Sequence, residues 1–581
     1  MRLLVSKSAN ASSFYVQKDI KKGNSRTTVI VEKLGTETEI MEKYGVADAK
    51  AWALDYIASL NRIEKEKKTE IMPVNMKLFP QQTISNRQRI FNGGYLPLQS
   101  IYHSLGLNKI CKKISSNSKF EYNLNSILSR LIYTRILFPG SKLNAFEESK
   151  KFIEDPEFDL HQVYRALDVL NKESDYIQSQ LYKNSTKVTQ RNASVLYYDC
   201  TNYFFEIEEA DDEGQLRQYG RSKENRPNPI VQLGLFIDAN GIPLAFNVTP
   251  GNTNEQVTAI PLESRIIEDF KITDFVYVAD AGLGSNEIRL FNTFNNRDFL
   301  VTQSLKKLKK EDLDVILDEN HWYCPETGKY DVKLSDISDD DEKTYFKMMR
   351  INMPVDLGLR ELTKTNRTKK RSDFYQTLIV SFNKQTQLYQ RGVRAKQVER
   401  ALENIKHNRM EKTTENSPKR FIAAENNSYY FNNERVIYEQ QFDGFYGMVT
   451  SLEEDMPLIA TVMKRRWQIE ESFKIMKTSL KARPVYHQKD DRIMAHFGIC
   501  FLALLAFRIL EKKLGNKYTI DKIIKQLKLM TVTEFTPTKY ATNYKGSRLL
   551  NDLDDAFGKN MNLNMYTFNQ LNRLKGNTLI K

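Results

Sequence analysis

VLYYDCTNYFFEI at residues 195–207 opens a series of four apolar segments that decides the fold. The other three are PIVQLGLFID at 229–238, IPLAFNVT at 242–249 and FVYVAD at 275–280. β-branched and aromatic residues dominate all four, which is typical of strands, and a helical pattern near 255–270 separates the third from the fourth. Three strands, a helix and a further strand predict an α/β core.

Two patterns precede this core. Residues 14–34 alternate apolar and polar around a turn, and residues 47–66 have helical periodicity, which predicts a small α+β module over 1–75. From about 97 to 187 the chain carries apolar residues at three and four spacing almost throughout. This spacing predicts a helical bundle over 76–190.

The core itself is interrupted. From residue 303 the chain becomes charged and turn-rich, with strand patterns near 329–334, 345–352 and 375–382, and a second strand-to-helix pattern follows only after residue 440. We therefore predict a β-rich insertion within one core. The regions of this half are the first part of the core at 191–302, the insertion at 303–440, the second part of the core at 441–515 and a C-terminal helical region at 516–581.

Composition indicates a large basic protein. The chain has 581 residues, of which 40% are hydrophobic and 11% aromatic, enough for several packed domains. Lys and Arg number 87 against 73 Asp and Glu, a net charge of +14. Such an excess favours a polyanionic partner, because cations that neutralise phosphates release counterions. Nucleic acid is one such partner, although ribosome-associated proteins and ordinary surfaces can be equally basic.

Motifs of several other functional classes are missing from the sequence. The four cysteines lie far apart and form no CxxC pair, which predicts reduced thiols rather than a zinc ribbon or a disulfide framework. The histidines show no HExxH spacing, and no GxxxxGK[ST] phosphate loop occurs. The strongest apolar run, FGICFLALLAF at 497–507, is too short to span a bilayer, and residues 1–10 show no signal-like core. We expect a cytoplasmic protein without a membrane partner.

Two aspartates stand out within the core. Asp199 lies inside a strongly apolar strand, where an unpaired carboxylate is costly to bury and needs a partner or a metal. Asp280 ends the strand FVYVAD, and functional groups of open α/β sheets gather at such carboxyl ends. Either residue, taken alone, could instead cap the loop that follows its strand.

A third acidic candidate lies on the predicted helix KRRWQIEESFKIMKTSLKARPVY, which begins at Lys464. Its apolar stripe consists of Ile469, Phe473, Met476 and Leu480. A polar set, separated by three, four and seven positions, consists of Met463, Arg466, Glu470 and Lys477. Taken alone, Arg466 and Glu470 could form an ordinary surface salt bridge between residues four apart.

With these residues the chain resembles the bacterial insertion-sequence DDE transposases, whose third motif is Y-x2-R-x3-E-x6-K. Arg466, Glu470 and Lys477 match this motif in order and spacing, and Met463 stands where the motif has tyrosine. The resemblance extends to YYDCTNYFFE around Asp199, to residues 219–252, to VADAGL around Asp280 and to WQIEESFKIMKTSLKARPVYH. It covers about residues 195–510.

The resemblance implies an RNase H-like catalytic core of the α/β class, with a β-rich insertion and mainly helical flanking regions. It also implies that Asp199, Asp280 and Glu470 bind two Mg²⁺ ions, for which Mn²⁺ can substitute, with Asp199 bridging both. In-line attack on a phosphodiester needs an activated nucleophile and a stabilised leaving oxygen, and paired divalent ions supply both. Magnesium prefers hard oxygen ligands. Glu471 is the rival third ligand, but it is rotated about 100° around the helix from Glu470.

Several cations and one aromatic residue are candidates for contact with DNA. Arg466 and Lys477 are expected to contact phosphates beside the scissile bond, and Arg221 with Lys223 to do so from a loop. Each could instead be a solvated surface cation. Trp322 could stack on a flipped base, but packing inside the insertion is the favoured interpretation. The helical bundle could recognise DNA ends or only pack on the core.

These features predict a transposase that binds the terminal inverted repeats of its own element in double-stranded DNA. By resemblance, it forms a homodimer in a synaptic complex, cleaves the ends and transfers them to target DNA in the bacterial cytoplasm, associated with the nucleoid when bound. Two alternatives remain at this point. One is an RNase H-like nuclease without strand transfer, and the other is a DNA-binding transposase derivative whose carboxylates are only structural.

Overall fold

The computed structural model describes residues 1–8, 11–22, 25–70, 88–293, 296–360, 369–407, 417–425 and 428–579, in two compact units, Met1–Arg87 and Gln88–Lys581. The first unit is an antiparallel sheet followed by two helices. Its elements are β1 (Arg2–Lys7), β2 (Ser12–Lys22), β3 (Ser25–Thr36), α1 (Glu37–Tyr44) and α2 (Ala49–Glu70). The predicted hairpin is β2 and β3, and Thr36 with Glu39 forms the capping box that begins α1.

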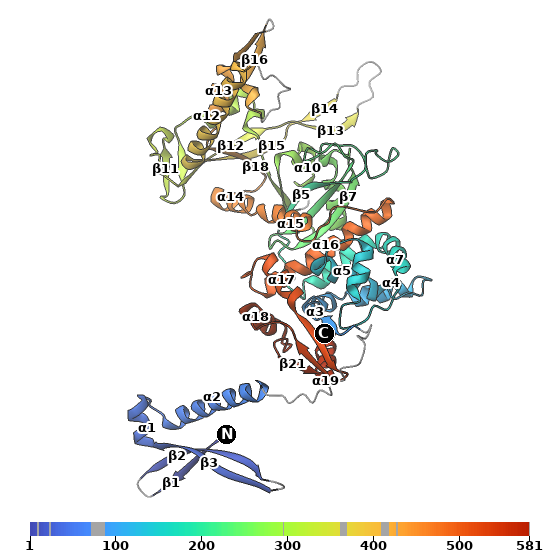
Figure 1. Cartoon of the computed structure of the whole chain (residues 1–581). Helices are drawn as coiled ribbons and strands as arrows, with labels where there is room; N and C mark the ends of the chain where they lie inside the picture. The colour runs from blue at the N-terminus through green and yellow to red at the C-terminus, as the bar shows by residue number, and fades with distance from the viewer. Residues whose placement is uncertain are drawn as a thin grey trace. The chain divides into compact units, whose positions relative to one another are not determined.

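The second unit is built on a ten-stranded mixed sheet with the order β11-β10-β12-β15-β18-β9-β8-β5-β6-β7 (Figure 1). The α/β class is confirmed. The four apolar segments form β5 (Val195–Phe204), β6 (Ile230–Asp238), β7 (Pro243–Pro250) and β8 (Phe275–Ala279), followed by β9 (Arg297–Thr302). β5 is antiparallel to β6 but parallel to β8, and β8 is parallel to β9.

Both faces of the sheet are covered at β5 and β6, which explains why these strands are buried along almost their whole length. Leu196 and Tyr198 of β5 point into one hydrophobic core, together with residues of the helical segment α9 (Ala259–Arg265). Tyr197 and Tyr203 point into the other core. Since side chains alternate along a strand, Asp199 belongs to the face of Tyr197, whose hydroxyl bonds the carbonyl of Val462.

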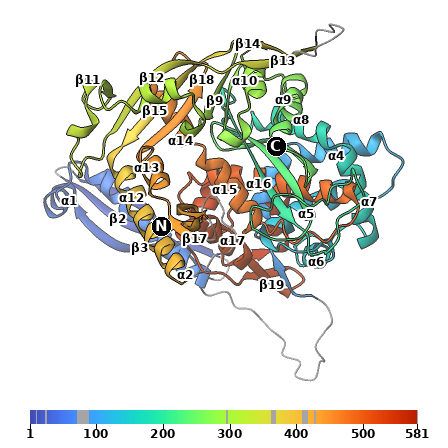
Figure 2. The same ribbon diagram turned by 90° about the horizontal axis from the view of Figure 1, so that it is seen from above.

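Helices form the second core. Those that precede β5 are α3 (Leu96–Ser104), α4 (Leu107–Ser116), α5 (Leu124–Leu137), α6 (Lys142–Ser149), α7 (Leu160–Lys172) and α8 (Ser174–Ser185). They pack with α16 (Asp490–Lys513), and Figure 2 shows α16 between α15 (Trp467–Lys477) and α5.

α16 is longer than its apolar run predicted. The run at 497–507 continues in both directions with helical polar residues, which gives 24 residues in all. By length and composition alone, α16 could cross a membrane, but 83% of its most apolar window is buried inside the protein. Its apolar surface is therefore buried against α3, α5, α7 and β7.

The insertion extends the same sheet. Predicted strands near 329–334, 345–352 and 375–382 are confirmed as β11 (Lys329–Val332), β12 (Thr344–Asn352) and β15 (Tyr375–Asn383). β15 pairs with β18 (Phe445–Thr450), which in turn pairs with β9 of the core. A short helix of the core, α10 (Asn286–Phe291), precedes β9. The remaining helices and strands of the insertion are α11 (Lys310–Leu317), β10 (Trp322–Cys324), β13 (Val355–Arg360), β14 (Lys369–Ser372), α12 (Lys384–Lys406), β16 (Ile422–Glu425), β17 (Ser428–Phe431) and α13 (Asn433–Gln440).

The C-terminal region contains a small sheet besides its helices, which the prediction of a helical region for 516–581 did not include. It contains α17 (Ile520–Leu529), β19 (Thr531–Thr536), β20 (Lys539–Thr542), α18 (Arg548–Phe557), β21 (Met565–Thr567) and α19 (Phe568–Leu579). The sheet β21-β20-β19 is completed by β4 (Ile90–Asn92) from the start of this unit. Strands of three to six residues that pair with so distant a segment leave little local pattern to read.

Trp322 is buried, so the prediction that it is available to stack on a base is wrong. Its side chain is 0% exposed and packs against Phe382 and Phe445. Its indole N–H donates to the carbonyl of Asp318 at 2.9 Å. The residue packs β10 against β15 and β18, as the favoured interpretation of packing predicted.

Replacing Trp322 with Ala is expected to destabilise the protein by about 3–5 kcal/mol, because a fully buried aromatic side chain leaves a cavity. Denaturant unfolding of the full chain measures the change. Tyr389→Ala is the control: Tyr389 is 73% exposed on α12, and its loss is expected to change stability by no more than about 0.5 kcal/mol. Equal effects of the two substitutions would contradict the assignment.

Candidate active site

The strand register brings Asp199 and Asp280 to the same level of the sheet. In the parallel pair of β5 and β8, Tyr197 lies opposite Val278. Continuing both strands by two residues places Asp199 beside Asp280. The two carboxylates interact electrostatically, because the charge of Asp280 contributes to raising the pKa of Asp199. Sequence-distant aspartates are thus neighbours in space.

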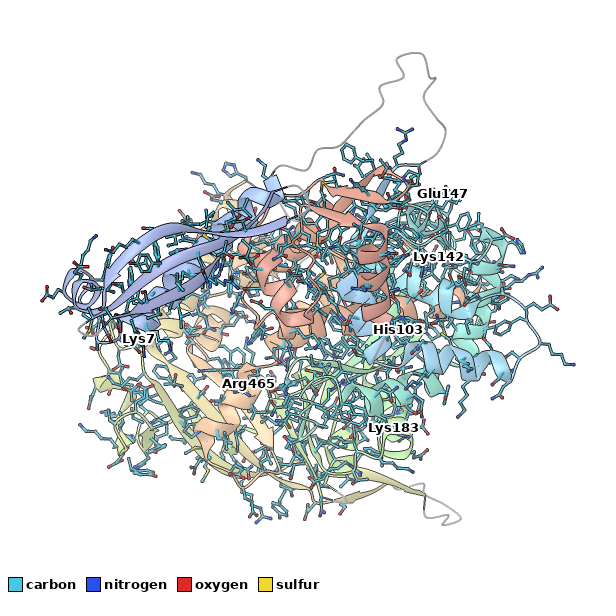
Figure 3. The ribbon with its side chains drawn as sticks, turned by 90° about the horizontal axis from the view of Figure 1, so that it is seen from below. Lys7, His103, Lys142, Glu147, Lys183 and Arg465 are labelled. Atoms are coloured by element: carbon cyan, nitrogen blue, oxygen red, sulfur yellow. The ribbon has the colours of Figure 1, made fainter. Side chains whose placement is uncertain are left out.

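Glu470 reaches this edge through a break between two helices. The helix predicted to begin at Lys464 is α15 (Trp467–Lys477), and a separate helix, α14 (Met456–Lys464), precedes it. Arg465, labelled in Figure 3, lies at the break between them. Arg466, the N-cap of α15, binds two carboxylates with one guanidinium. Its Nη1 lies 2.9 Å from Asp280 Oδ2, and its Nη2 lies 2.8 Å from Glu470 Oε1.

The salt bridge between Arg466 and Glu470 is therefore more than a surface pair between residues four apart. The Arg466 side chain is only 17% exposed, whereas the carboxylates of Asp280 and Glu470 are 43% and 57% exposed. The arginine is packed in place while the acidic groups face solvent. Arg466 thus links Glu470 to Asp280, and Asp280 lies beside the more deeply buried Asp199, where β8 ends next to β5.

Asp199 is the electrostatically strained member. Burial raises the pKa of Asp199 from 3.8 to about 6, and the charge of Asp280 acts in the same direction. Lys223, a backbone hydrogen bond from Cys200 at 2.8 Å and Arg466 oppose that shift. A desolvated carboxylate beside a second carboxylate is a group whose charge a cation would relieve.

Glu471 points elsewhere. Its Oε2 lies 2.9 Å from Nη2 of Arg508 on α16. Glu471 also lines a hollow together with Lys474 and Lys512, and Glu470 is not among the residues that line it. The geometry thus favours Glu470 over Glu471 as the partner of the two aspartates.

The predicted phosphate-binding cations fall into two groups. Arg466 lies among the carboxylates, as described. Lys477 lies 3.5 Å from Glu224 Oε1, and Lys223 lies close enough to Asp199 to lower its pKa. Arg221 is exposed on the same loop, where its carbonyl accepts a hydrogen bond from Asn202 at 3.0 Å.

Two hydroxyl groups lie beside Asp280 that the sequence did not predict to be part of the site. Thr302, which ends β9, donates to Asp280 Oδ1 at 3.5 Å, and its Oγ1 lies 2.8 Å from the hydroxyl of Tyr446 on β18. Met448 of β18 pairs with Thr302, so Tyr446 is a diagonal neighbour on the same face of the sheet. Nothing in the local sequence marks either residue, because the contact depends on strand order.

A hollow of about 210 Å³ adjoins these groups. It is lined by residues that include Tyr446, Met463, Arg466, Trp467 and Glu470. Met463, at the position of the motif's tyrosine, is buried, whereas Trp467 is 55% exposed. An aromatic surface is thus available beside the carboxylates, and it comes from Trp467 rather than from Trp322.

The donor chemistry of this edge fits a divalent cation such as magnesium. Three carboxylates supply hard oxygen ligands, and Asp199 is strained in its charged form. Within the described part of the chain, no three acidic, histidine or cysteine side chains are gathered closely enough to chelate an ion. Arg466 instead pairs with both Asp280 and Glu470.

Comparison with known proteins identifies the family. The model described as the transposase DDE domain matches residues 204–506, more than half of the chain, and includes Asp280 and Glu470. Curated protein sequences show no significant match. Among solved structures, a piggyBac transposase in a synaptic complex with hairpin DNA aligns at 10% identity and a TM-score of 0.34, over 76% of this chain and 82% of that one. At so low a TM-score, the family assignment rests on the sequence match.

Replacing Asp199 with Asn is expected to stabilise the metal-free protein at neutral pH. The folded-state pKa of about 6 lies above the unfolded value of 3.8, so folding favours the neutral carboxyl. Its contribution is complete below pH 3.8 and is lost as the pH rises through about 6. At pH 7 the ionised group costs up to about 3 kcal/mol, at about 1.4 kcal/mol per pKa unit, and asparagine removes that cost.

Thermal unfolding in EDTA measures this effect. The gain in stability should be present at pH 7 and vanish near pH 4, where wild-type Asp199 is itself largely neutral in the folded protein. A variant that is less stable than wild type at pH 7, or equally stabilised at both pH values, would contradict the electrostatic account.

Proposed function

The chain belongs to the transposase DDE domain family, and from that premise we propose that it cleaves the ends of its own DNA element and joins them to target DNA. The observation that carries the proposal is the convergence of Asp199, Asp280 and Glu470 at one edge of the sheet, with Arg466 between two of them. The strand order from β7 to β9 suits an RNase H-like core, on which such chemistry takes place.

The acidic residues would act together on one phosphodiester. Asp199, Asp280 and Glu470 would hold two divalent ions, Mg²⁺ or Mn²⁺, which when bound activate the attacking oxygen and stabilise the leaving oxygen. Thr302 would orient Asp280 through its hydroxyl, because it already donates to that carboxylate. Arg466, released from the carboxylates, would bind a phosphate oxygen beside the scissile bond.

The partner would be double-stranded DNA. Lys477, Lys223 and Arg221 lie on the elements that flank Asp199 and would contact the backbone, which positions DNA without reading its sequence. We propose that the terminal inverted repeats are recognised by other parts of the chain, and that two copies assemble at paired ends in the bacterial cytoplasm. The four cysteines are free and buried, in keeping with that compartment.

Asp280→Asn and Glu470→Gln are each expected to reduce cleavage of element ends by at least about a thousandfold while leaving end binding within about twofold. The reason is that the metal ligands are lost but the cationic surface stays, and essential catalytic groups contribute losses of this order. Gel-shift and cleavage assays with the DNA that flanks the reading frame measure both properties. Glu471→Gln is the matched control, because Glu471 binds Arg508, and it should retain cleavage.

The products also distinguish the proposal from its alternatives. Joined products from wild-type protein support strand transfer, whereas cleavage without joining would assign a nuclease. Binding without cleavage at any divalent ion concentration would assign a DNA-binding derivative. Cleavage by either Asp280→Asn or Glu470→Gln at the wild-type rate would remove that residue from the active site.

A further inference from the structure

A cationic cluster with one acidic residue at its centre lies beside the three carboxylates. Glu224, on the loop between β5 and β6, is contacted by Arg483 and lies 3.5 Å from Lys477 Nζ. Lys223 is close enough to affect Lys477 electrostatically, and it also lies 3.3 Å from Glu255. Two cations, Arg483 and Lys477, therefore contact Glu224. Lys223 adjoins them, with its ammonium bonded to the Cys200 carbonyl.

The two cations that hold Glu224 are fixed by packing. Lys477 lies over the ring of Tyr203 and Arg483 over the ring of Phe204, at 5.4 Å and 5.5 Å from the centroids. Their side chains are 15% and 27% exposed. Both cations are thus held against the end of β5 by these rings, and the Glu224 carboxylate is not needed to position them.

Glu224 itself is anchored differently. It belongs to a loop whose residues from 221 to 228 are exposed or half-buried. Its carboxylate is 26% exposed, so an anion from solvent can approach the same two cations. A carboxylate and a phosphate both present oxygen acceptors to arginine and lysine, which makes them exchangeable ligands of one site.

The position of the cluster relates it to the reacting bond. Lys223 is near Asp199 on one side and near Lys477 on the other. A DNA strand whose phosphate is bound by Lys477 and Arg483 would therefore place a nearby phosphodiester of the same strand at Asp199, Asp280 and Glu470. This step rests on the proposed function.

We propose that Lys477 and Arg483 form a binding site for a DNA backbone phosphate that Glu224 fills in the free protein and leaves when DNA binds. Arg483 is accordingly a DNA-contacting residue that the transposase motif does not contain. Glu224 acts as a competing anion: it neutralises the site without DNA and weakens non-specific binding, because every duplex must first displace it.

The test is duplex binding by the full chain in EDTA, with a short fluorescent DNA of arbitrary sequence, measured by anisotropy over a range of salt. Glu224→Gln is expected to bind about fivefold more tightly than wild type, the order of one partly exposed ion pair that no longer has to be broken. Glu224→Asp keeps the charge and should bind within about twofold of wild type. Glu471→Gln removes the same charge from a pair with Arg508 and should also stay within about twofold.

Arg483→Ala separates a specific site from a general charge effect. In the Glu224→Gln background Arg483 is free for phosphate, so its loss should weaken binding at least about threefold more than in wild type and lower the salt slope by about one. Thermal unfolding verifies that each variant is folded.

Several results would overturn the inference. Unchanged or weaker binding by folded Glu224→Gln would do so, as would an equal gain in Glu471→Gln or an equal cost of Arg483→Ala in both backgrounds. If Glu224→Gln does not fold, the Arg483→Ala change in salt slope in wild type decides, and no change overturns the site. Duplex binding absent from every protein would overturn the proposed function as well, whereas binding that ignores Glu224 overturns this inference alone.

Discussion

Like charges held together are the constraint on which this structure depends. Two carboxylates about 4 Å apart near a protein surface repel each other by about 4 kcal/mol, so a fold that gathers three of them must offset that repulsion. In the free protein the Arg466 guanidinium does so for Asp280 and Glu470. For Asp199 the charges of Lys223 and Arg466 and a backbone hydrogen bond offset burial only in part, so its pKa stays raised.

The sheet sets which groups meet. Parallel pairing of β5 with β8 aligns the two aspartates, and the antiparallel pairing of β9 with β18 adds Thr302 and Tyr446 beside Asp280. The insertion lengthens this sheet without separating β5 from β8, because its strands join beyond β18. Beside the three carboxylates, Glu224 neutralises Lys477 and Arg483 in the free protein, and DNA would neutralise the same cations in a complex.

The sequence predicted those features that depend on residues close together along the chain. Apolar strands, the periodicity of α15 and the motif spacing of Arg466, Glu470 and Lys477 identified the core and its acidic residues. The roles of Trp322, Thr302 and Arg483 depend on contacts between distant elements, and no periodicity reports those. Trp322 resembles any tryptophan on a loop until its neighbours Phe382 and Phe445 are known. The short C-terminal strands were missed because their pairing partner, β4, lies at the other end of the unit.

Anomalous scattering from crystals of the protein grown with Mn²⁺ and an uncleaved DNA end tests the central claim most directly. The account predicts manganese peaks about 2.0–2.2 Å from carboxylate oxygens of Asp199, Asp280 and Glu470, with the Arg466 guanidinium moved onto a phosphate. Manganese bound elsewhere, or Arg466 still bridging Asp280 and Glu470 in a complex that cleaves DNA once it is supplied with Mg²⁺, would contradict it.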